Sequence, residues 1–292
     1  DIIQVTTLHM SWIVDYLRKK TNAPIILRQE NYETRIMHRY FKMQNNLLLK
    51  LFSYIQYIKF INYEPKQCLK FDNCVMISEE DQNDLKRLNP NIKTSVIPVG
   101  VESNLLKYNC IKKEEFSIAH IGNVEWFPNY DSLKWLIEDI FPKVKRKYPQ
   151  SKLYVYSSKI PSAINVSEEI KNSIIEVGYV DDLWGNLIEK KVSIVPLRIG
   201  SGIRVKILEM LAVGQTVITT SIGKEGINVN NEENIIIADT TNEIVCKISA
   251  VFEGQFNIQQ MSINGKNLIN QYYIWEKVIS KFEQLYIGLL KK

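Results

Sequence analysis

The stretch VSIVPLRIGSGIRVKILEML, residues 192–211, sets an apolar run, a glycine-rich turn and an amphipathic segment in direct succession. The apolar run is typical of a central strand in a parallel sheet. The Gly-Ser-Gly sequence at 200–202 predicts a turn, and a helix is predicted over 203–213. One face of that helix carries apolar residues four apart, Ile203, Ile207 and Leu211. A strand, tight turn and helix of this kind indicate an α/β fold with a parallel sheet.

The predicted turn and helix start suit an anionic ligand. Glycines let the backbone approach a ligand closely, and the first helical N–H groups are unpaired and carry positive dipole character. Arg204 and Lys206 add positive charge, which suits a diphosphate. Glu209 lies further along, where a carboxylate can accept hydrogen bonds from the vicinal hydroxyls of a ribose. The combination indicates a nucleoside diphosphate, although spacing alone also allows an ordinary loop, a solvated Arg204 and a simple Lys206–Glu209 helix pair.

Two other phosphate-binding motifs are not matched. The glycines of 200–202 lack the third glycine of a dinucleotide fingerprint and do not follow the first strand of a unit. No GxxxxGK[ST] sequence occurs, so the P-loop is excluded.

Composition limits the class of partner. The chain has 292 residues, of which 45% are hydrophobic and 24% charged, and this length predicts one large domain or two medium ones. The 37 Lys and Arg exceed the 32 Asp and Glu by 5, which fits a small anionic ligand or an acidic membrane surface and is too weak to indicate nucleic acid.

Cysteines and histidines indicate neither disulfides nor a metal site. The four cysteines show no paired spacing, so we expect reduced thiols in a cytoplasmic protein: Cys68, Cys74, Cys110 and Cys246. His9, His38 and His120 are scattered, which argues against a histidine metal site, and we expect His9 and His120 to be structural.

The rest of the chain alternates strands and helices. In the first part we expect strands at 1–7, 23–29, 73–78 and 94–100, with helices at 10–21, 35–71 and 79–88. Residues 101–115 read as a linker. In the second part we expect strands at 117–121, 152–157, 174–177, 192–196, 216–219 and 235–237, with helices at 130–147, 203–213 and 270–290. This order predicts two α/β domains with a ligand crevice between them.

These residues also carry a resemblance to a known family. The stretch 192–227 closely resembles the nucleotide-sugar site of group 1 (family 4) glycosyltransferases, which have the GT-B fold. Four more stretches are similar to other parts of that fold, at 26–41, 71–102, 120–157 and 177–197. The resemblance implies two Rossmann-like domains facing across a cleft. We place the N-terminal domain at 1–108 and the nucleotide-sugar domain at 109–275, with a C-terminal helix at 276–292 packing back towards the first.

The chain begins at Asp1 within what reads as a buried strand. On the resemblance to the GT-B fold, we therefore expect the N-terminal domain to be incomplete.

The resemblance implies that a sugar moves from a nucleotide diphosphate sugar to a glycan or lipid-linked acceptor. Retention and independence of metal are implied as well, with the nucleotide sugar as co-substrate and no cofactor. The similar branch suggests cell-surface polysaccharide synthesis. Two other readings stay open, a nucleotide-sugar epimerase and a non-catalytic or degenerate GT-B scaffold.

Site residues follow from the same resemblance. Arg204 and Lys206 would hold the diphosphate and stabilise it as it leaves, and Glu209 would hold the ribose. Ser201 stands where many relatives have the first glutamate of a Glu-x7-Glu pattern, and Glu30 stands where relatives often have a histidine that reaches the donor sugar. The remaining implied donor contacts come from three segments: Gly122 and Asn123; Gly178, Tyr179 and Val180; and Arg198, Gly200, Gly202 and Ile203.

Several further residues have plainer interpretations. Asp181-Asp182 is not the DxD of metal-dependent transferases and predicts a helix-starting turn. Trp126 and Trp184 are expected to pack, and Glu33 and Arg35 to form a solvated helix start. The stretch 35–70 is basic with interleaved aromatic and aliphatic residues, so it either packs on the N-terminal domain or touches the inner face of an anionic membrane.

Overall fold

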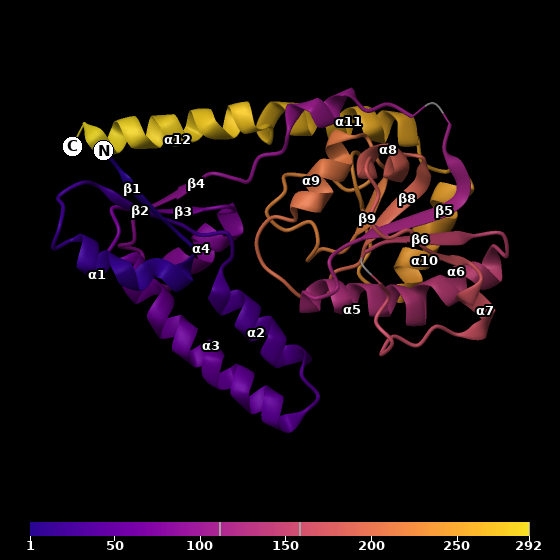
Figure 1. Cartoon of the computed structure of the whole chain (residues 1–292), viewed down its shortest axis with the longest axis horizontal. Helices are drawn as coiled ribbons and strands as arrows, with labels where there is room; N and C mark the ends of the chain where they lie inside the picture. The colour runs from indigo at the N-terminus through magenta and orange to yellow at the C-terminus, as the bar shows by residue number, and fades with distance from the viewer. Residues whose placement is uncertain (111, 158, 292) are drawn as a thin grey trace.

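The protein has two α/β units, each built on a parallel sheet (Figure 1). The computed structural model describes residues 1–110, 112–157 and 159–291. The N-terminal unit carries a four-stranded sheet in the order β1-β2-β3-β4, and the C-terminal unit a six-stranded sheet in the order β10-β9-β8-β5-β6-β7. The prediction of two α/β units is confirmed.

Short strands and long helices make up the N-terminal unit. Its strands are β1 (Ile3–Thr6), β2 (Ile25–Arg28), β3 (Asn73–Met76) and β4 (Thr94–Val96). Its helices are η1 (Leu8–Ile13), α1 (Val14–Leu17), α2 (Glu33–Met43), α3 (Leu47–Cys68) and α4 (Glu79–Leu88). Helices α2 and α3 form a hairpin that projects from the sheet (Figure 1).

The C-terminal unit follows a short 3-10 helix, η2 (Ser103–Lys107). Its strands are β5 (Glu114–Ile121), β6 (Lys152–Tyr156), β7 (Ile174–Glu176), β8 (Lys190–Val195), β9 (Val217–Thr219) and β10 (Ile236–Ile237). Its helices are α5 (Phe127–Trp135), η3 (Leu136–Ile140), α6 (Phe141–Lys147), α7 (Glu168–Lys171), α8 (Leu183–Ile188), α9 (Val205–Ala212), α10 (Thr241–Phe252) and α11 (Ile258–Tyr272).

Strand β8 has the burial expected of a central strand. It pairs with β5 on one side and β9 on the other, both parallel. Val195 packs into the core on one face of the sheet, while Val192 and Ile194 pack into the core on the other. Helices therefore cover both faces, and the carboxyl end of β8 opens directly into the glycine loop, which we define as Leu197–Arg204.

The last helix, α12 (Trp275–Leu290), returns to the N-terminal unit. Its Val278 packs with Ile26, Val75 and Ile97, and the Tyr286 hydroxyl donates a hydrogen bond of 2.8 Å to Gln4. Figure 1 shows α12 running along the N-terminal unit towards the chain's first residue.

The two connections between the units lie side by side. The Val101 N–H donates to the carbonyl oxygen of Tyr273 at 2.8 Å, and the Trp275 N–H donates to that of Val101 at 3.1 Å. Gly100 is needed here, because a Cβ at this position would lie 2.6 Å from the Trp275 ring.

Several element predictions were wrong in detail. The helix expected over 35–71 is broken after Met43, since Asn46 caps α3 by accepting hydrogen bonds from the N–H groups of Leu48 and Leu49. The helix expected over 130–147 starts at Phe127 and contains the π-helical turn η3. The segment 10–21 is 3-10 helix up to Ile13 and α-helix only over Val14–Leu17, and the final helix is interrupted at 273–274 by the crossing between units. Helices α10 and α11 were not expected.

Within the described part of the chain, no helix is long and apolar enough to cross a membrane.

Candidate active site

The glycine loop connects β8 to α9 through two residues with unusual backbone angles. Gly200 has φ of +139° and Gly202 has φ of +77°, values that residues with a side chain rarely adopt. A Cβ at Gly202 would lie 2.6 Å from the carbonyl oxygen of Glu30, so the loop touches the N-terminal unit by its bare backbone. The turn predicted at 200–202 is confirmed, and α9 begins at Val205.

Lys206 turns from the first turn of α9 towards the loop after β5. Its ammonium donates to the carbonyl oxygen of Ile121 at 2.9 Å and to Asn129 Oδ1 at 2.8 Å. It also lies 3.1 Å from the place where Gly122 would carry a Cβ. Its two hydrogen-bond partners are neutral oxygens, and desolvation, helped by the nearby charge of Arg204, lowers the pKa of Lys206 to about 7.

Lys206 does not pair with Glu209. Among the described residues no carboxylate lies within 4.0 Å of its ammonium, so the interpretation as an ordinary helix ion pair is wrong. A half-buried cation without a counter-charge is destabilising unless a ligand supplies the negative charge.

Arg204 folds back on the glycine loop. Its guanidinium donates to the carbonyl oxygen of Gly202 at 2.7 Å and to that of Ser201, and only 5% of the residue is exposed. In the part of the chain that the structure describes, Nε and Nη2 have no hydrogen-bond partner. Burial lowers the pKa of Arg204 to about 10. Unused donors on a buried guanidinium are available to an anion at the loop, and the expectation of a solvated Arg204 is wrong.

Glu209 lies one turn beyond Lys206 on α9 and is half-buried. Burial raises the pKa of its carboxyl group to about 7. A carboxyl group with a raised pKa in a half-buried position is suited to hydrogen bonding with neutral hydroxyl groups.

A pocket of about 570 Å³ opens at the carboxyl ends of β5 and β6, and we call it the strand-end pocket. Five predicted residues line it, namely Gly122, Asn123, Gly178, Tyr179 and Val180. Tyr156 and Ser157 contribute from the end of β6, and Tyr179 is fully exposed at its rim. Because Lys206 contacts Ile121 and approaches Gly122, the ammonium stands at the inner edge of this pocket.

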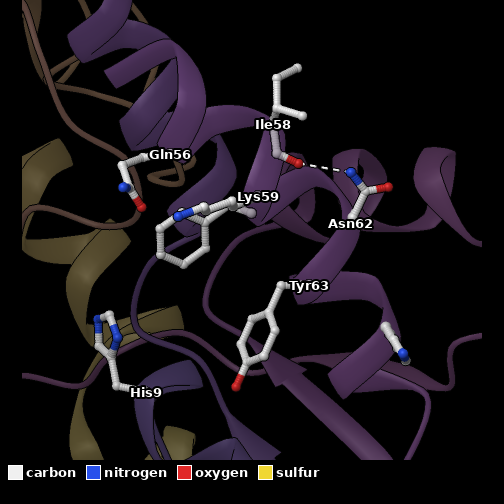
Figure 2. A pocket seen from close by; sticks show the side chains of 8 residues that line it. His9, Gln56, Ile58, Lys59, Asn62 and Tyr63 are labelled. Atoms are coloured by element: carbon white, nitrogen blue, oxygen red, sulfur yellow. Dashed lines mark hydrogen bonds between the residues drawn. The ribbon is translucent and has the colours of Figure 1, made fainter. Parts of the chain in front are cut away.

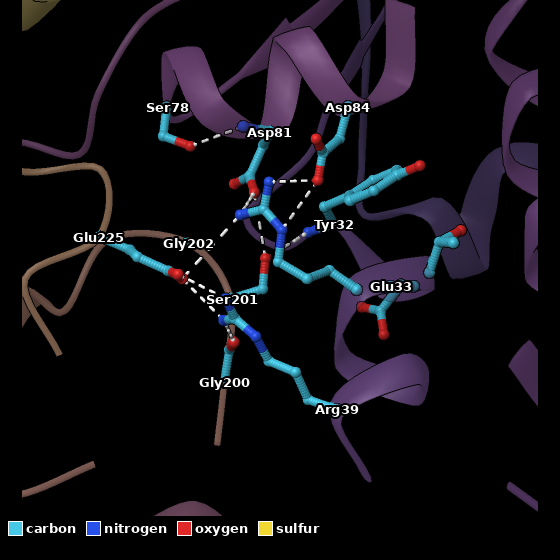
Figure 3. Close-up of polar contacts among 12 residues, drawn as sticks. Tyr32, Glu33, Arg39, Ser78, Asp81, Asp84, Gly200, Ser201, Gly202 and Glu225 are labelled. Carbon is cyan, nitrogen blue, oxygen red and sulfur yellow. Dashed lines mark hydrogen bonds and ion pairs between the residues drawn. The ribbon is translucent and has the colours of Figure 1, made fainter. Parts of the chain in front are cut away.

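Ion pairs and hydrogen bonds join the glycine loop to the N-terminal unit (Figure 3). Arg39 of α2 pairs with Glu225 through two nitrogens and also donates to the carbonyl oxygen of Gly200. The Ser201 hydroxyl donates to Asp81 at 3.1 Å and accepts from the Tyr32 N–H at 3.3 Å. The loop is therefore held against α2 and α4.

Arg35 is part of the same cluster. Its guanidinium donates to Asp81 at 2.6 Å and to Asp84 at 2.7 Å and lies 4.0 Å from Glu225, and only 11% of its side chain is exposed. The prediction that Glu33 and Arg35 form a solvated helix start was wrong: Arg35 pairs across the N-terminal unit, and the side chain of Glu33 is only 17% exposed beside His9.

Arg198 does not face the strand-end pocket. It donates to both oxygens of Asp131 at 2.6 and 3.0 Å and lies over the Trp135 ring. The prediction of a diphosphate contact from Arg198 is corrected, because its charge is already satisfied within the C-terminal unit. The side chain of Glu30 is exposed, and its residue meets the glycine loop only through its carbonyl group.

Some of the remaining predictions are confirmed and others are wrong. Asp182 caps α8 by accepting from the Gly185 N–H at 3.0 Å, which confirms the helix-starting turn. His120 is buried and neutral, since burial lowers its pKa to about 3, and its Nδ1 contacts the carbonyl oxygen of Ile194 at 2.9 Å. His9 is exposed, so it is not a core histidine. Trp184 packs on the core, while Trp126 is largely exposed.

Sequence reasoning missed four residues of the site: Asn129, Arg39, Asp81 and Glu225. Each acts on a partner more than 70 residues away, so spacing along the chain gives no signal. The nearest signal is the pair Arg35 and Arg39, four apart in the first half of the amphipathic helix α2.

A second pocket, of about 660 Å³, lies between η1 and α3, and we call it the helix pocket (Figure 2). Three bases line it, His9, Lys59 and Lys66, together with the aromatic rings of Phe60 and Tyr63. It contains no carboxylate among its lining residues.

The architecture and the comparisons define the class of the protein as a GT-B fold. The solved structure of sucrose-phosphate synthase from Thermosynechococcus elongatus is similar over 99% of this chain and 74% of its own, with a TM-score of 0.78 and 16% identity. The solved structure of Anabaena Alr3699/HepE in complex with UDP is similar over 100% of this chain and 79% of its own, with a TM-score of 0.74 and 13% identity. A glycosyltransferase from Rickettsia africae is similar over 100% of this chain and 77% of its own, with a TM-score of 0.73 and 16% identity.

Sequence comparison gives a partial family match and one curated relative. Residues 115–253 match the family described as "Glycosyl transferases group 1". A curated relative, described as an uncharacterized 44.6 kDa protein in the cps region of Klebsiella pneumoniae, is 23% identical over 263 residues, which cover 87% of this chain. The chain spans 66% of that relative's length. The matched residues are 139 of the chain's 292, and this match agrees with the resemblance to group 1 glycosyltransferases that the sequence shows.

Proposed function

We propose that the protein transfers a sugar from a nucleotide diphosphate sugar to a glycan or lipid-linked acceptor. The observation that carries this proposal is Lys206, a half-buried cation bonded only to neutral oxygens at the inner edge of the strand-end pocket. A diphosphate placed beside it would supply the missing negative charge.

The same place offers further donors to a diphosphate. The first N–H groups of α9 point towards the glycine loop, and Arg204 has two nitrogens without partners among the described residues. With the phosphates at the helix start, the strand-end pocket is adjacent and has room for a nucleoside, and Glu209 is one turn away for the ribose hydroxyls.

In the proposed reaction the bond between the sugar's anomeric carbon and the diphosphate oxygen breaks. A bond from the same carbon to the acceptor oxygen forms, and the acceptor's proton passes to the departing diphosphate. Negative charge grows on the leaving group, so Lys206, Arg204 and the α9 amides act more strongly in the transition state than on the bound donor. We propose retention of configuration, and independence of metal because these groups already supply positive charge.

Two comparisons support the choice of probe and pathway. The Anabaena structure holds UDP, and a pneumococcal O-GlcNAc transferase of the same fold is in complex with UDP and GlcNAc. The curated relative is described as lying in a cps region. We propose UDP-sugars as first donors and cell-surface polysaccharide synthesis as the setting.

The test is calorimetric titration of the purified chain with UDP, GDP and ADP, followed by turnover with the matching nucleotide sugars. We expect Lys206→Met to weaken binding by about 1–3 kcal/mol through the loss of a charge-assisted contact. Lys134→Met, which removes an exposed lysine of α5, is the matched control. Equal binding by the Lys206 variant and its control would refute the proposed phosphate site.

Product analysis then separates the alternatives. Transfer to an added glycan or lipid-linked acceptor supports the proposal. Release of nucleotide with an epimerised sugar would identify an epimerase, and tight binding without turnover would identify a binding scaffold.

A further inference from the structure

The tip of the α2–α3 hairpin carries a run of exposed apolar residues that includes the two most exposed leucines of the described chain. Leu47 and Leu48, the first residues of α3, are 81% and 80% exposed. The following turns of the helix also expose large apolar side chains, namely Leu49, Leu51, Phe52, Tyr54, Ile55 and Ile58. We call these eight residues the hairpin patch.

The hairpin patch is not the outer face of an ordinary surface helix. Such a helix has an apolar stripe on one side and polar residues on the other. The first turns of α3 are instead apolar all round the helix axis, because Leu47, Leu48 and Leu49 are consecutive and all exposed. Apolar surface of this extent on a folded protein marks an interaction site.

Aromatic contacts hold the hairpin in shape. His38 of α2 stacks on Tyr57 of α3 with ring centres 4.8 Å apart, and Phe41 meets Tyr54 at 5.2 Å. Figure 1 shows the two helices lying together and reaching away from both sheets. The patch is therefore displayed on a packed projection.

The charge of the same segment is uniform in sign. Residues 34–63 contain five Lys and Arg and no Asp or Glu, and the rest of the chain holds 32 of each sign, so the net charge of +5 resides in this segment. Arg35 and Arg39 pair within the cleft, which leaves three lysines, Lys42, Lys50 and Lys59, on the hairpin.

We propose that the hairpin patch and these lysines dock the protein on an anionic lipid bilayer. Apolar residues would enter the boundary between head groups and acyl chains, while the lysines contact anionic head groups. Charge complementarity selects this occupant, because an apolar surface flanked by cations alone matches the negative surface of a membrane. The helix pocket lies further along α3, and Lys59 and Lys66 add positive charge there, while His9 lies 3.7 Å from Glu33.

Docking here would orient the catalytic cleft. Helix α2, the other arm of the hairpin, carries Arg39, which pairs with Glu225, and its Tyr40 meets Phe127 of α5 at 5.5 Å. A membrane-bound hairpin therefore lies next to the mouth of the cleft, where a lipid-linked acceptor would enter. The acceptor's role depends on the proposed function, whereas docking itself does not.

The experiment is flotation of the full chain with vesicles of phosphatidylcholine alone and with 30% phosphatidylglycerol. We expect at least a tenfold preference for the anionic vesicles, because each lysine near such a surface contributes about fivefold. The triple variant Leu48→Ser, Leu51→Ser, Phe52→Ser should lose at least tenfold in binding, and Lys42→Gln, Lys50→Gln, Lys59→Gln should lose the preference.

Matched controls separate the surface from general hydrophobicity and folding. The triple variant Ile279→Ser, Ile287→Ser, Leu290→Ser removes exposed apolar residues from α12 and should bind vesicles as the unmodified chain does. Near-ultraviolet circular dichroism and UDP titration check that each variant folds and retains the nucleotide site. Failure of UDP binding alone would overturn the proposed function and leave docking intact.

Three results would overturn docking. The first is equal vesicle binding by the hairpin and α12 variants, and the second is equal binding to neutral and anionic vesicles. The third is a concentration-dependent dimer in light scattering that the hairpin variant abolishes, since the patch would then bind a second copy of the chain.

Discussion

Replacing Lys206 by methionine should change nucleotide binding and its dependence on pH together. In the nucleotide-free protein, burial lowers the pKa of Lys206 from 10.5 to about 7. This shift corresponds to a penalty of at most roughly 5 kcal/mol for the charged ammonium, and to less where water reaches the group. A bound diphosphate offsets that penalty, so binding should restore the proton.

The expected magnitudes follow from that pKa. Above pH 7 the free protein must take up a proton to bind, so affinity for UDP should fall by about tenfold per pH unit between pH 7 and 9. At pH 8, where the diphosphate is fully ionised, binding should take up about 0.9 proton, and this uptake should shrink as the pH falls towards 7. The methionine variant should bind more weakly at pH 7 and show neither effect.

The assay is calorimetric titration of UDP at pH 6, 7, 8 and 9 in pairs of buffers that differ in ionisation enthalpy. The difference in observed heat between two buffers gives the number of protons taken up. The reasoning is refuted if affinity does not vary from pH 7 to 9, or if Lys206→Met takes up as many protons as the unmodified chain.

Stability supplies an independent check on the same group. Because the folded pKa lies below the unfolded value, the unfolded state holds more protons between pH 7 and 10.5, and the free energy of unfolding should rise with pH in that window through Lys206. The methionine variant should lack this rise in urea unfolding.

Three further changes test other parts of the structure. Arg39→Ala and Glu225→Gln should each let the two units separate, which would raise the radius of gyration in X-ray scattering. A double-mutant cycle of stability should show a coupling of about 1–3 kcal/mol between the two residues, and simple additivity would contradict the ion pair. Burial raises the pKa of Glu64 in the folded state to about 7, so between pH 4.5 and 7 the folded state keeps a proton that the unfolded state releases. The free energy of unfolding should therefore fall by up to roughly 3 kcal/mol over that range, and Glu64→Gln should remove this fall. The same slope in both proteins would contradict this. Gly202→Ala should cost more stability and UDP affinity than Gly254→Ala, because both have positive φ but only Gly202 lacks space for a Cβ; equal losses would show that contact between the loop and the N-terminal unit is unimportant.

Local patterns predicted the centre of the fold well. The strand, turn and helix around Gly200 and Gly202 were predictable because apolar spacing and glycine act within a few residues of one another. The same local information missed α10, although Thr240 and Glu243 form a capping box at its start. It also missed the break before Asn46, where three polar residues interrupt a long apolar run.

Long-range pairing explains the errors at the candidate site. Arg198 was assigned to the ligand because its partner, Asp131, lies 67 residues earlier in the chain. Arg35 was expected in solvent because Asp81 and Asp84 lie on another helix. Charge partners fixed only by the tertiary fold cannot be deduced from the residues that flank a cation.

The pairing of the two connections at Val101 has a mechanical consequence. A single connecting strand would let one unit swivel freely, whereas two strands hydrogen-bonded to each other form a band that bends more easily than it twists. The two units should then open and close by a hinge motion about these connections, and each closure should return the glycine loop to the same position on α2. Residues of these paired connections, Gly100 above all, would control how often the two units separate, although none of them touches a reacting atom.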